Sequence, residues 1–75
     1  MQKVPQKQLN RFSTNLKRLR AVAGLSQEAL AERADITARY LQFIEAAQFG
    51  ASFAVLLRLR RALGCKWAEL LAGLD

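Results

Sequence analysis

The chain has 75 residues, which is enough for one small domain and too few for a catalytic domain with a second unit. Twelve Lys and Arg residues outnumber six Asp and Glu residues, and the net charge of +6 favours an anionic partner such as nucleic acid or a membrane surface. His is absent and Cys65 is the single cysteine, which excludes a His-based catalytic triad, an intrachain disulfide and a Cys/His zinc site. We therefore expect no enzyme, no metal and no cofactor.

The sequence has no segment typical of a membrane or exported protein. Its longest stretch without a charge, 46–57, is too short to cross a bilayer. The N-terminus has no apolar core like that of a signal peptide. We expect a cytoplasmic protein without membrane binding, in which a lone thiol is ordinary.

The first eight residues are rich in Gln and Lys and contain Pro5, which predicts a flexible basic arm over 1–8. No acidic residue occurs before Gly24. Basic arms commonly follow a DNA backbone. The candidates for that role are Lys3, Lys7 and Arg11. The remaining residues, 9–75, are expected to form one domain.

An apolar face with spacings of four, three and four residues predicts the first helix. It consists of Phe12, Leu16, Leu19 and Ala23. Gly24 is placed to end this helix in a left-handed cap. Ser26 is an N-cap for a second helix that ends near Arg33, and Thr37 is an N-cap for a third helix over 38–46.

Ser52 is the N-cap candidate of a fourth helix, which Gly64 ends. The predicted inner face of this helix holds Phe53, Leu56, Leu59 and Leu63. A short fifth helix holds Trp67, Leu70 and Leu71. No useful length of chain alternates with a period of two, so no strand is expected and the fold class is all-α.

The second and third helices are short, and only about 34–36 separates them. This is the arrangement of a helix-turn-helix, whose second helix lies in the major groove of DNA. Several strings stand in one continuous register over roughly 12–71. They are LKRLR at 16–20, GLSQEALA at 24–31, Ile36-Thr37, Tyr40-Leu41, Ile44-Glu45 and Leu63-Gly64. In these residues the chain resembles the Cro/repressor-type (XRE, lambda-repressor-like) helix-turn-helix family. The resemblance implies a compact five-helix domain with its helix-turn-helix at about 26–46.

The resemblance also implies a sequence-specific regulator of transcription that binds double-stranded DNA, either as a stand-alone repressor or as a restriction–modification-type controller. One recognition helix covers only a few base pairs, so we expect a homodimer on a pseudo-palindromic operator with half-sites about 10 bp apart. In related proteins the last helix and the preceding loop commonly form the dimer. The candidates for the dimer interface are Phe49, Trp67, Leu71 and Leu74. The C-terminal apolar face could instead cap the core.

DNA contacts are expected at the start of the second helix and along the outer face of the third. The candidates are Gln27, Thr37, Ala38, Arg39, Tyr40, Gln42 and Phe43. Gln27 lies where free backbone N–H groups attract phosphate, and the alternative is a solvated amide. Arg39 can bond to guanine O6 and N7, or can touch phosphate only.

The other candidates on the third helix have less specific roles. Ala38 could touch a thymine methyl group, and Gln42 a base edge or phosphate. Thr37 is a helix cap first and a phosphate contact second. Tyr40 either reaches phosphate through its hydroxyl or is a half-buried aromatic. Phe43 either packs on thymine methyl groups or joins Phe49 in contact with another subunit, and these two alternatives stay open.

The resemblance further implies a salt bridge between Arg20 and Glu45 that fixes the angle of the recognition helix. The segment 46–52 departs from the family pattern, which has Gly at position 47. Because Ala takes a left-handed cap less readily than Gly, we expect the third helix to run longer or Gly50 to take over the cap. Lys66 likewise stands where Ser or Thr usually caps the last helix.

An antitoxin-like or protein-interaction module that keeps the fold and binds a protein partner is the alternative function. Phe43, Phe49 and the altered loop favour it. The basic cluster on the fourth helix is expected to be an ordinary solvated face. It consists of Arg58, Arg60 and Arg61. Cys65 is expected to be a small buried hydrophobe.

Overall fold

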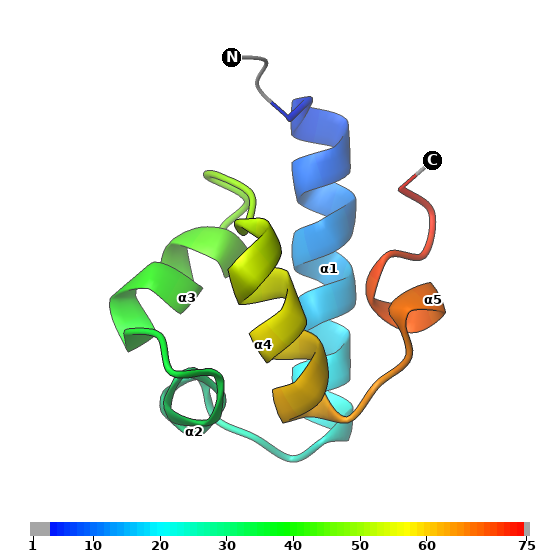
Figure 1. Cartoon of the computed structure of the whole chain (residues 1–75). Coiled ribbons are helices and arrows are strands. Elements are labelled where there is room, and N and C mark those ends of the chain that lie inside the picture. The colour runs from blue at the N-terminus through cyan, green and yellow to red at the C-terminus, as the bar shows by residue number, and fades with distance from the viewer. Residues whose placement is uncertain (1–3, 75) are drawn as a thin grey trace.

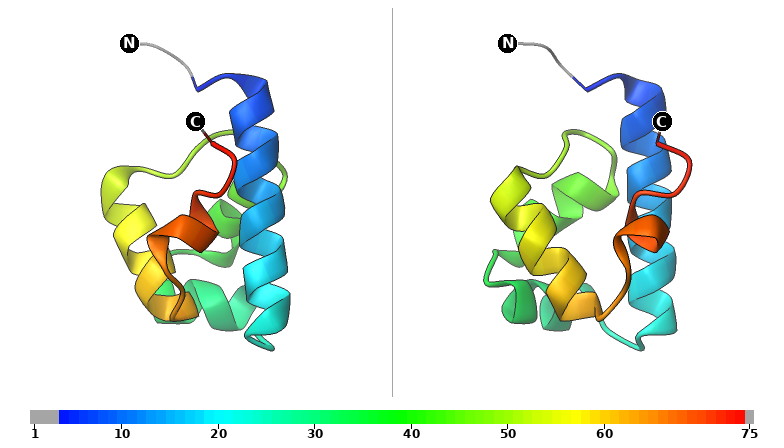
Figure 2. Two further views of the ribbon diagram at one scale, coloured as in Figure 1. Left: turned by 90° about the vertical axis from the view of Figure 1, so that its right-hand side faces the viewer. Right: turned by 45° about the vertical axis from the view of Figure 1, so that its right-hand side comes forward.

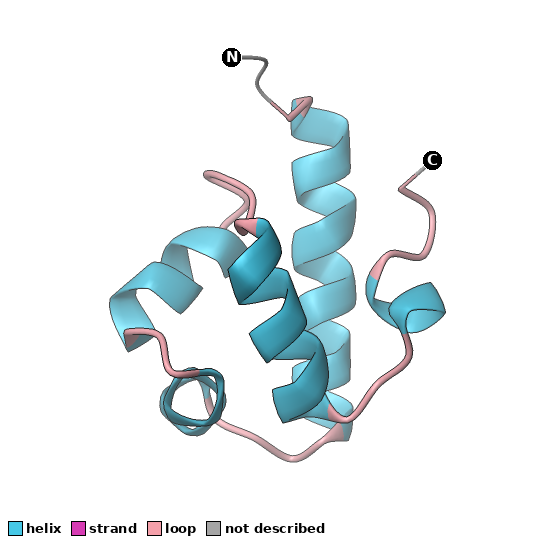
Figure 3. Ribbon diagram, in the orientation of Figure 1, coloured by secondary structure: helices cyan, strands magenta, loops and turns pink. Residues whose placement is uncertain are grey.

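The computed structural model describes residues 4–74, and this part of the chain contains five helices and no strand (Figures 1 and 3). The helices are α1 (Gln6–Val22), α2 (Gln27–Ala34), α3 (Ala38–Glu45), α4 (Phe53–Leu63) and α5 (Trp67–Leu70). The predicted all-α, five-helix fold is confirmed. None of these helices is both long and apolar enough to cross a membrane.

The longest helix, α1, runs along the whole molecule and the other helices pack around it (Figure 1). It contacts α3 on one side and α5 on the other, and α4 packs across α2. Turning the molecule shows that α5 lies alongside α1 (Figure 2). The C-terminal segment then returns to the start of α1, where the Gln8 Nε2 atom donates a hydrogen bond to the Leu74 carbonyl at 3.2 Å.

The beginning of α1 corrects the predicted arm. The helix begins at Gln6, and Leu9 is already buried, so a flexible arm that extends to Gln8 is wrong. Pro5 stands at the N-cap with a φ of −58°, where its missing N–H costs the helix nothing. Lys3 lies outside the described residues.

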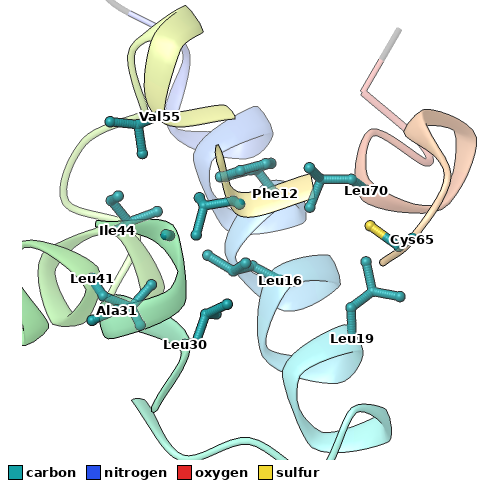
Figure 4. Close-up of a cluster of buried hydrophobic side chains, with 12 residues drawn as sticks. Phe12, Leu16, Leu19, Leu30, Ala31, Leu41, Ile44, Val55, Cys65 and Leu70 are labelled. Carbon is teal, nitrogen blue, oxygen red and sulfur yellow. The ribbon is translucent and has the colours of Figure 1, made fainter. Parts of the chain in front are cut away.

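One cluster of buried side chains draws on α1, α2, α3, α4 and α5 and the turn before α5 (Figure 4). Its members are Phe12, Leu16, Leu19, Leu30, Ala31, Ala34, Leu41, Ile44, Val55, Leu59, Cys65 and Leu70. Cys65 is buried as expected. Two predictions about inner faces are wrong, because Ala23 is exposed and Phe53 is 73% exposed. The buried face of α4 instead holds Val55 and Leu59, four residues apart, and Phe53, two residues before Val55, lies on the other side of the helix.

Three predicted N-caps are confirmed. The hydroxyl oxygens of Ser26, Thr37 and Ser52 accept hydrogen bonds from the backbone N–H groups three residues later, at 3.0, 3.0 and 3.3 Å. At α5 the cap is reversed, because the Lys66 side chain has no acceptor. Here the Glu69 carboxylate accepts from the Lys66 backbone N–H at 3.0 Å.

The C-terminal ends of α1 to α4 share a left-handed residue. Gly24 and Gly64 take this conformation as predicted, with φ of 71° and 66°. Asp35 and Ala47 also take it, with φ of 57° and 60°. The expectation that Ala47 would avoid it, through a longer helix or a cap at Gly50, is therefore wrong. The surrounding contacts impose a conformation that alanine alone disfavours.

A buried asparagine, which the sequence analysis did not single out, attaches α5 to α1. The Asn15 Nδ2 atom donates to the carbonyl oxygens of Leu70 and Ala72 at 3.0 and 2.9 Å. Leu70 is the last residue of α5 and Ala72 lies two residues beyond it, so neither carbonyl has a partner within this helix of four residues. Asn15 thereby satisfies them and fixes the C-terminal segment on the long helix.

Candidate nucleic-acid interface

The turn between α2 and α3 is built from Asp35, Ile36 and Thr37. Asp35 is left-handed, and the Ile36 N–H returns to the Ala31 carbonyl at 3.0 Å, which closes the end of α2. Ile36 packs against the core, and the next residue, Thr37, is the N-cap of α3. A left-handed residue, an apolar anchor and an N-cap in succession give a short bend between two short helices.

This bend leaves one face of α3 free. Leu41 and Ile44 are completely buried, whereas Arg39 and Gln42 point to solvent on the opposite side. Ala38 is partly buried and packs against the core. In Figure 1, α3 lies at the edge of the molecule, with α1 behind its inner side. The outer face of α3 is therefore accessible to a binding partner while the inner face stays packed on the core.

The orientation of α3 is held at its C-terminal end by Glu45. Arg20 on α1 donates from Nε to Glu45 Oε2 at 2.7 Å and from Nη2 to Oε1 at 3.0 Å, and from Nη1 to the Leu25 carbonyl at 3.0 Å. The Glu45 side chain is 3% exposed. The hydrogen bond with Glu45 raises the pKa of the Arg20 guanidinium above its ordinary value, and burial opposes this.

Gln27, the first residue of α2, joins the same group. Its Nε2 atom donates to Glu45 Oε1 at 2.9 Å, and its side chain is partly buried. A carboxylate at the end of a helix opposes the helix dipole, so these donors compensate an otherwise unfavourable charge. The predicted phosphate ligand thus also connects α2 to α3, a tie that the sequence analysis missed. Among residues 4–74, the Gln27 amide donates to no group other than Glu45.

Three aromatic side chains form a cluster beside the outer face of α3. The ring of Phe49 stacks on Tyr40 with centroids 5.5 Å apart and tilts against Phe43 at 5.7 Å. We call Tyr40, Phe43 and Phe49 the aromatic cluster. The guanidinium carbon of Arg39 lies 5.3 Å from the Phe43 ring centroid. Phe43 and Phe49 therefore meet within one chain, and Tyr40 is partly buried.

The basic residues of α4 differ in their surroundings. Arg60 is half-buried, lies 5.2 Å over the Trp67 ring and donates to the Cys65 carbonyl at 3.4 Å. It is therefore a packing residue, contrary to the expected solvated face. Arg58 and Arg61 are exposed, as predicted.

The predicted dimer residues fall into two classes. Phe49 and Leu71 are 41% and 37% exposed. Trp67 and Leu74 are partly buried and pack against the core of their own chain. Next to Leu71 lies a small apolar hollow of about 130 Å³ between the start of α1, the loop before α4 and the C-terminal segment. An exposed apolar surface thus exists near the C-terminus, and half of the predicted residues also serve the core.

No three His, Cys, Asp or Glu side chains of the described residues gather closely enough to hold a metal ion. The arrangement instead offers one helix with an open polar face, the three neighbouring rings of the aromatic cluster and an exposed guanidinium. These groups can donate hydrogen bonds to base edges and phosphates and can make apolar contacts.

Comparison with known proteins agrees with this geometry. A helix-turn-helix family model matches residues 16–70. No relative is found among curated protein sequences. Among solved structures, the chain is similar to the restriction-modification controller protein C.AhdI from Aeromonas hydrophila, with 35% identity and a TM-score of 0.78. The alignment covers 83% of this chain and 94% of that one. Both matches point to regulators that bind DNA rather than to enzymes.

Proposed function

The chain belongs to the helix-turn-helix family, and we propose that it regulates transcription by reading a specific double-stranded DNA sequence with α3 in the major groove. The observation that carries this proposal is the pose of α3. Its outer face is open, its inner face is fully buried, and its end is fixed by Arg20, Gln27 and Glu45. A rigid helix with a free polar face is what direct readout needs.

We assign roles by the chemistry of each side chain. Arg39, exposed in the first turn of α3, reads a guanine, and Gln42 reads a base edge or phosphate one turn further on. Thr37 donates its hydroxyl hydrogen to phosphate, because its oxygen already accepts from Tyr40 N. Gln27 offers its remaining amide N–H to the same backbone.

We further propose that the chain acts as a homodimer on a pseudo-palindromic operator, as a stand-alone repressor or a restriction–modification-type controller. One copy of α3 covers too few base pairs for a unique site, and two copies require half-sites about 10 bp apart. The likeness to a restriction-modification controller protein supports this class of regulator. Phe49 and Leu71 are the exposed candidates for the contact between copies, and Trp67 and Leu74 are the partly buried ones.

Selection of bound sequences from a random DNA pool tests the proposal. We expect an enriched inverted repeat for the wild-type chain and for Arg61→Ala, which removes an exposed arginine from α4. Arg39→Ala should give a repeat that is relaxed at one position in each half-site, because one bidentate contact contributes about 1–3 kcal/mol of discrimination.

A second measurement tests the dimer. Leu71→Asp should shift the chain to monomers in sedimentation equilibrium, whereas Val22→Asp, at a side chain that is 78% exposed, should not. Two results together would overturn the DNA-reading proposal: no sequence is enriched from the pool, and the chain binds DNA weakly, with an affinity that depends on salt concentration but not on sequence. The alternative of a protein-binding module would then stand, with Phe49 on its surface.

A further inference from the structure

We propose that Arg39 and Phe43 act as one reading unit for a guanine next to a pyrimidine that carries a 5-methyl group. The pyrimidine is thymine or 5-methylcytosine, and one such pair of neighbouring bases lies in each half-site. This inference rests on the proposed placement of α3 in the major groove. It adds the base element that α3 selects and a dependence on a single methyl group.

The two side chains are already in contact in the free chain. Arg39 and Phe43 are four residues apart and so lie on the same face of α3, one turn from each other. The guanidinium carbon stands 5.3 Å from the ring centroid. A cation held over an aromatic ring loses less conformational freedom when it binds, which favours a defined pose of Arg39 at a base edge.

The chemistry of the pair is complementary to two neighbouring base pairs. Guanine presents the O6 and N7 acceptors that a guanidinium bonds in bidentate fashion. The 5-methyl group of a pyrimidine is the apolar feature of the major groove, and an aromatic ring is a suitable contact for it. Successive bases rise by about 3.4 Å, so two side chains that touch each other address adjacent bases rather than distant ones.

Phe49 acts as the positioning residue of this unit. It comes from the loop before α4 and lies against Phe43 at 5.7 Å and Tyr40 at 5.5 Å. Tyr40 is itself partly buried and packs against the core. The stack of Phe49 on Tyr40 therefore ties the Phe43 ring to the body of the protein and restricts where the ring can move.

Thymine and 5-methylcytosine present the same methyl group at the same place in the groove. The chain should therefore bind thymine better than uracil, and 5-methylcytosine better than cytosine, at the position next to the guanine. Each comparison changes one methyl group of the DNA and nothing in the protein. Burial of one such group changes affinity by about fourfold.

The experiment uses the operator obtained from the random pool, with these single-methyl changes made in one half-site. For the wild-type chain we expect about fourfold weaker binding with uracil and about fourfold tighter binding with 5-methylcytosine than with cytosine. Phe43→Ala should remove both responses and should weaken the guanine preference without abolishing it, because Arg39 remains but loses its ring partner. Phe49→Ala should shrink the methyl response, taken as the ratio of affinities for the thymine and uracil sites so that any loss common to both sites cancels. Phe53→Ala, at an exposed phenylalanine, should leave this ratio unchanged. Uracil at a thymine elsewhere in the half-site is the matched DNA control.

The outcomes separate this inference from the proposed function. An enriched operator without a guanine next to a thymine, or one whose methyl changes have no effect, overturns the reading unit and leaves the regulator intact. A methyl response that persists in Phe43→Ala also overturns it. Failure to enrich any sequence overturns the proposed function and this inference together.

Discussion

The C-terminal ends of α3 and α4 have the same hydrogen bonds and different residues. At the end of α3, Gln48 N bonds to the Phe43 carbonyl at 3.1 Å and Ala47 N to the Ile44 carbonyl at 3.0 Å. At the end of α4, the equivalent bonds run from Cys65 N to the Arg60 carbonyl at 3.4 Å and from Gly64 N to Arg61 at 3.2 Å. Both are Schellman motifs.

The residues in these motifs place the stabilising contacts in different parts of the chain. At α4 the left-handed residue is Gly64 and the next one, Cys65, is buried, so local sequence supplies both the conformation and its apolar anchor. At α3 the left-handed residue is Ala47 and the next one, Gln48, is exposed. The end of α3 must therefore be held by side chains that are distant in the sequence. These are Arg20 and Gln27, which donate to Glu45, and Phe49, which packs on Tyr40 and Phe43.

The largest expected effect comes from removing that distant support. Arg20→Met leaves the buried Glu45 carboxylate with Gln27 as its remaining side-chain donor. We expect a loss of about 3 kcal/mol of unfolding free energy, the low end for a broken buried pair because Arg20 is partly exposed. For a domain of this size the melting temperature should fall by about 12 °C or more. Thermal unfolding followed by circular dichroism measures this change.

Two controls distinguish the broken pair from general damage to α1. Arg18→Met removes an exposed arginine from the same helix and should change stability by less than about 0.5 kcal/mol. Adding Glu45→Met to Arg20→Met removes the unpaired charge and should recover most of the loss. A double variant as unstable as the single one would mean that packing, and not charge, holds α3.

The left-handed residues offer the cleanest comparison of the two ends. Ala47→Gly should stabilise the protein and Gly64→Ala should destabilise it, each by about 1 kcal/mol, because alanine pays the left-handed penalty in both cases. A Cβ at position 64 meets no atom within 4 Å, so backbone strain is the whole cost there. Chemical denaturation midpoints measure both changes.

The opposite signs make this test strict. A reversal of both signs would show that the flexibility of glycine in the unfolded chain outweighs the strain, and equal signs would show that this balance differs between the two ends. Ala46→Gly, beside Ala47 but with a negative φ of −85°, is the matched control and should not stabilise the protein.

The contrast between the two ends also explains what could be predicted from the sequence. Gly24 and Gly64 stood out as caps, and so did the serine and threonine N-caps, because each acts on residues within one turn of itself. Ala47 and Asp35 were not recognised as left-handed, since neither residue prefers that conformation strongly enough to signal it.

Within the candidate site the same limit applies. The pairing of Arg20 with Glu45 followed from family resemblance, whereas the hydrogen bond from Gln27 to Glu45 depends on how α2 and α3 meet in space. The position of Phe49 over Tyr40 and Phe43 likewise needs the course of the loop after α3. The assignment of Phe53 to the inner face failed because 53–57 are all apolar, so helical spacing fits Val55 and Leu59 as well as it fits Phe53 and Leu56.

A smaller effect is expected from the loop. Phe49→Ala removes two aromatic contacts and should cost about 1 kcal/mol, since aromatic pairs contribute about 0.5–1.5 kcal/mol beyond area burial. Phe53→Ala, which truncates an equally large but 73% exposed ring, should change stability by less than about 0.5 kcal/mol. Urea denaturation of both variants measures the difference, and equal losses would mean that the aromatic cluster does not support the end of α3.

The subtlest difference between the two ends lies in the exposure of the residue after the left-handed one. Burial, with a further contribution from the Glu69 charge, raises the pKa of the Cys65 thiol, so less reactive thiolate is present near neutral pH. Iodoacetamide should therefore alkylate Cys65 slowly in the folded chain and quickly in denaturant. In a Cys65→Ala background, Gln48→Cys places a thiol at the equivalent, exposed position of α3. It should react at least about tenfold faster than Cys65, because an opening that costs only about 1.4 kcal/mol slows alkylation by that factor. Equal rates would mean that the thiol of Cys65 is as accessible as the exposed thiol at position 48. Burial of Cys65 would then give the end of α4 no extra protection.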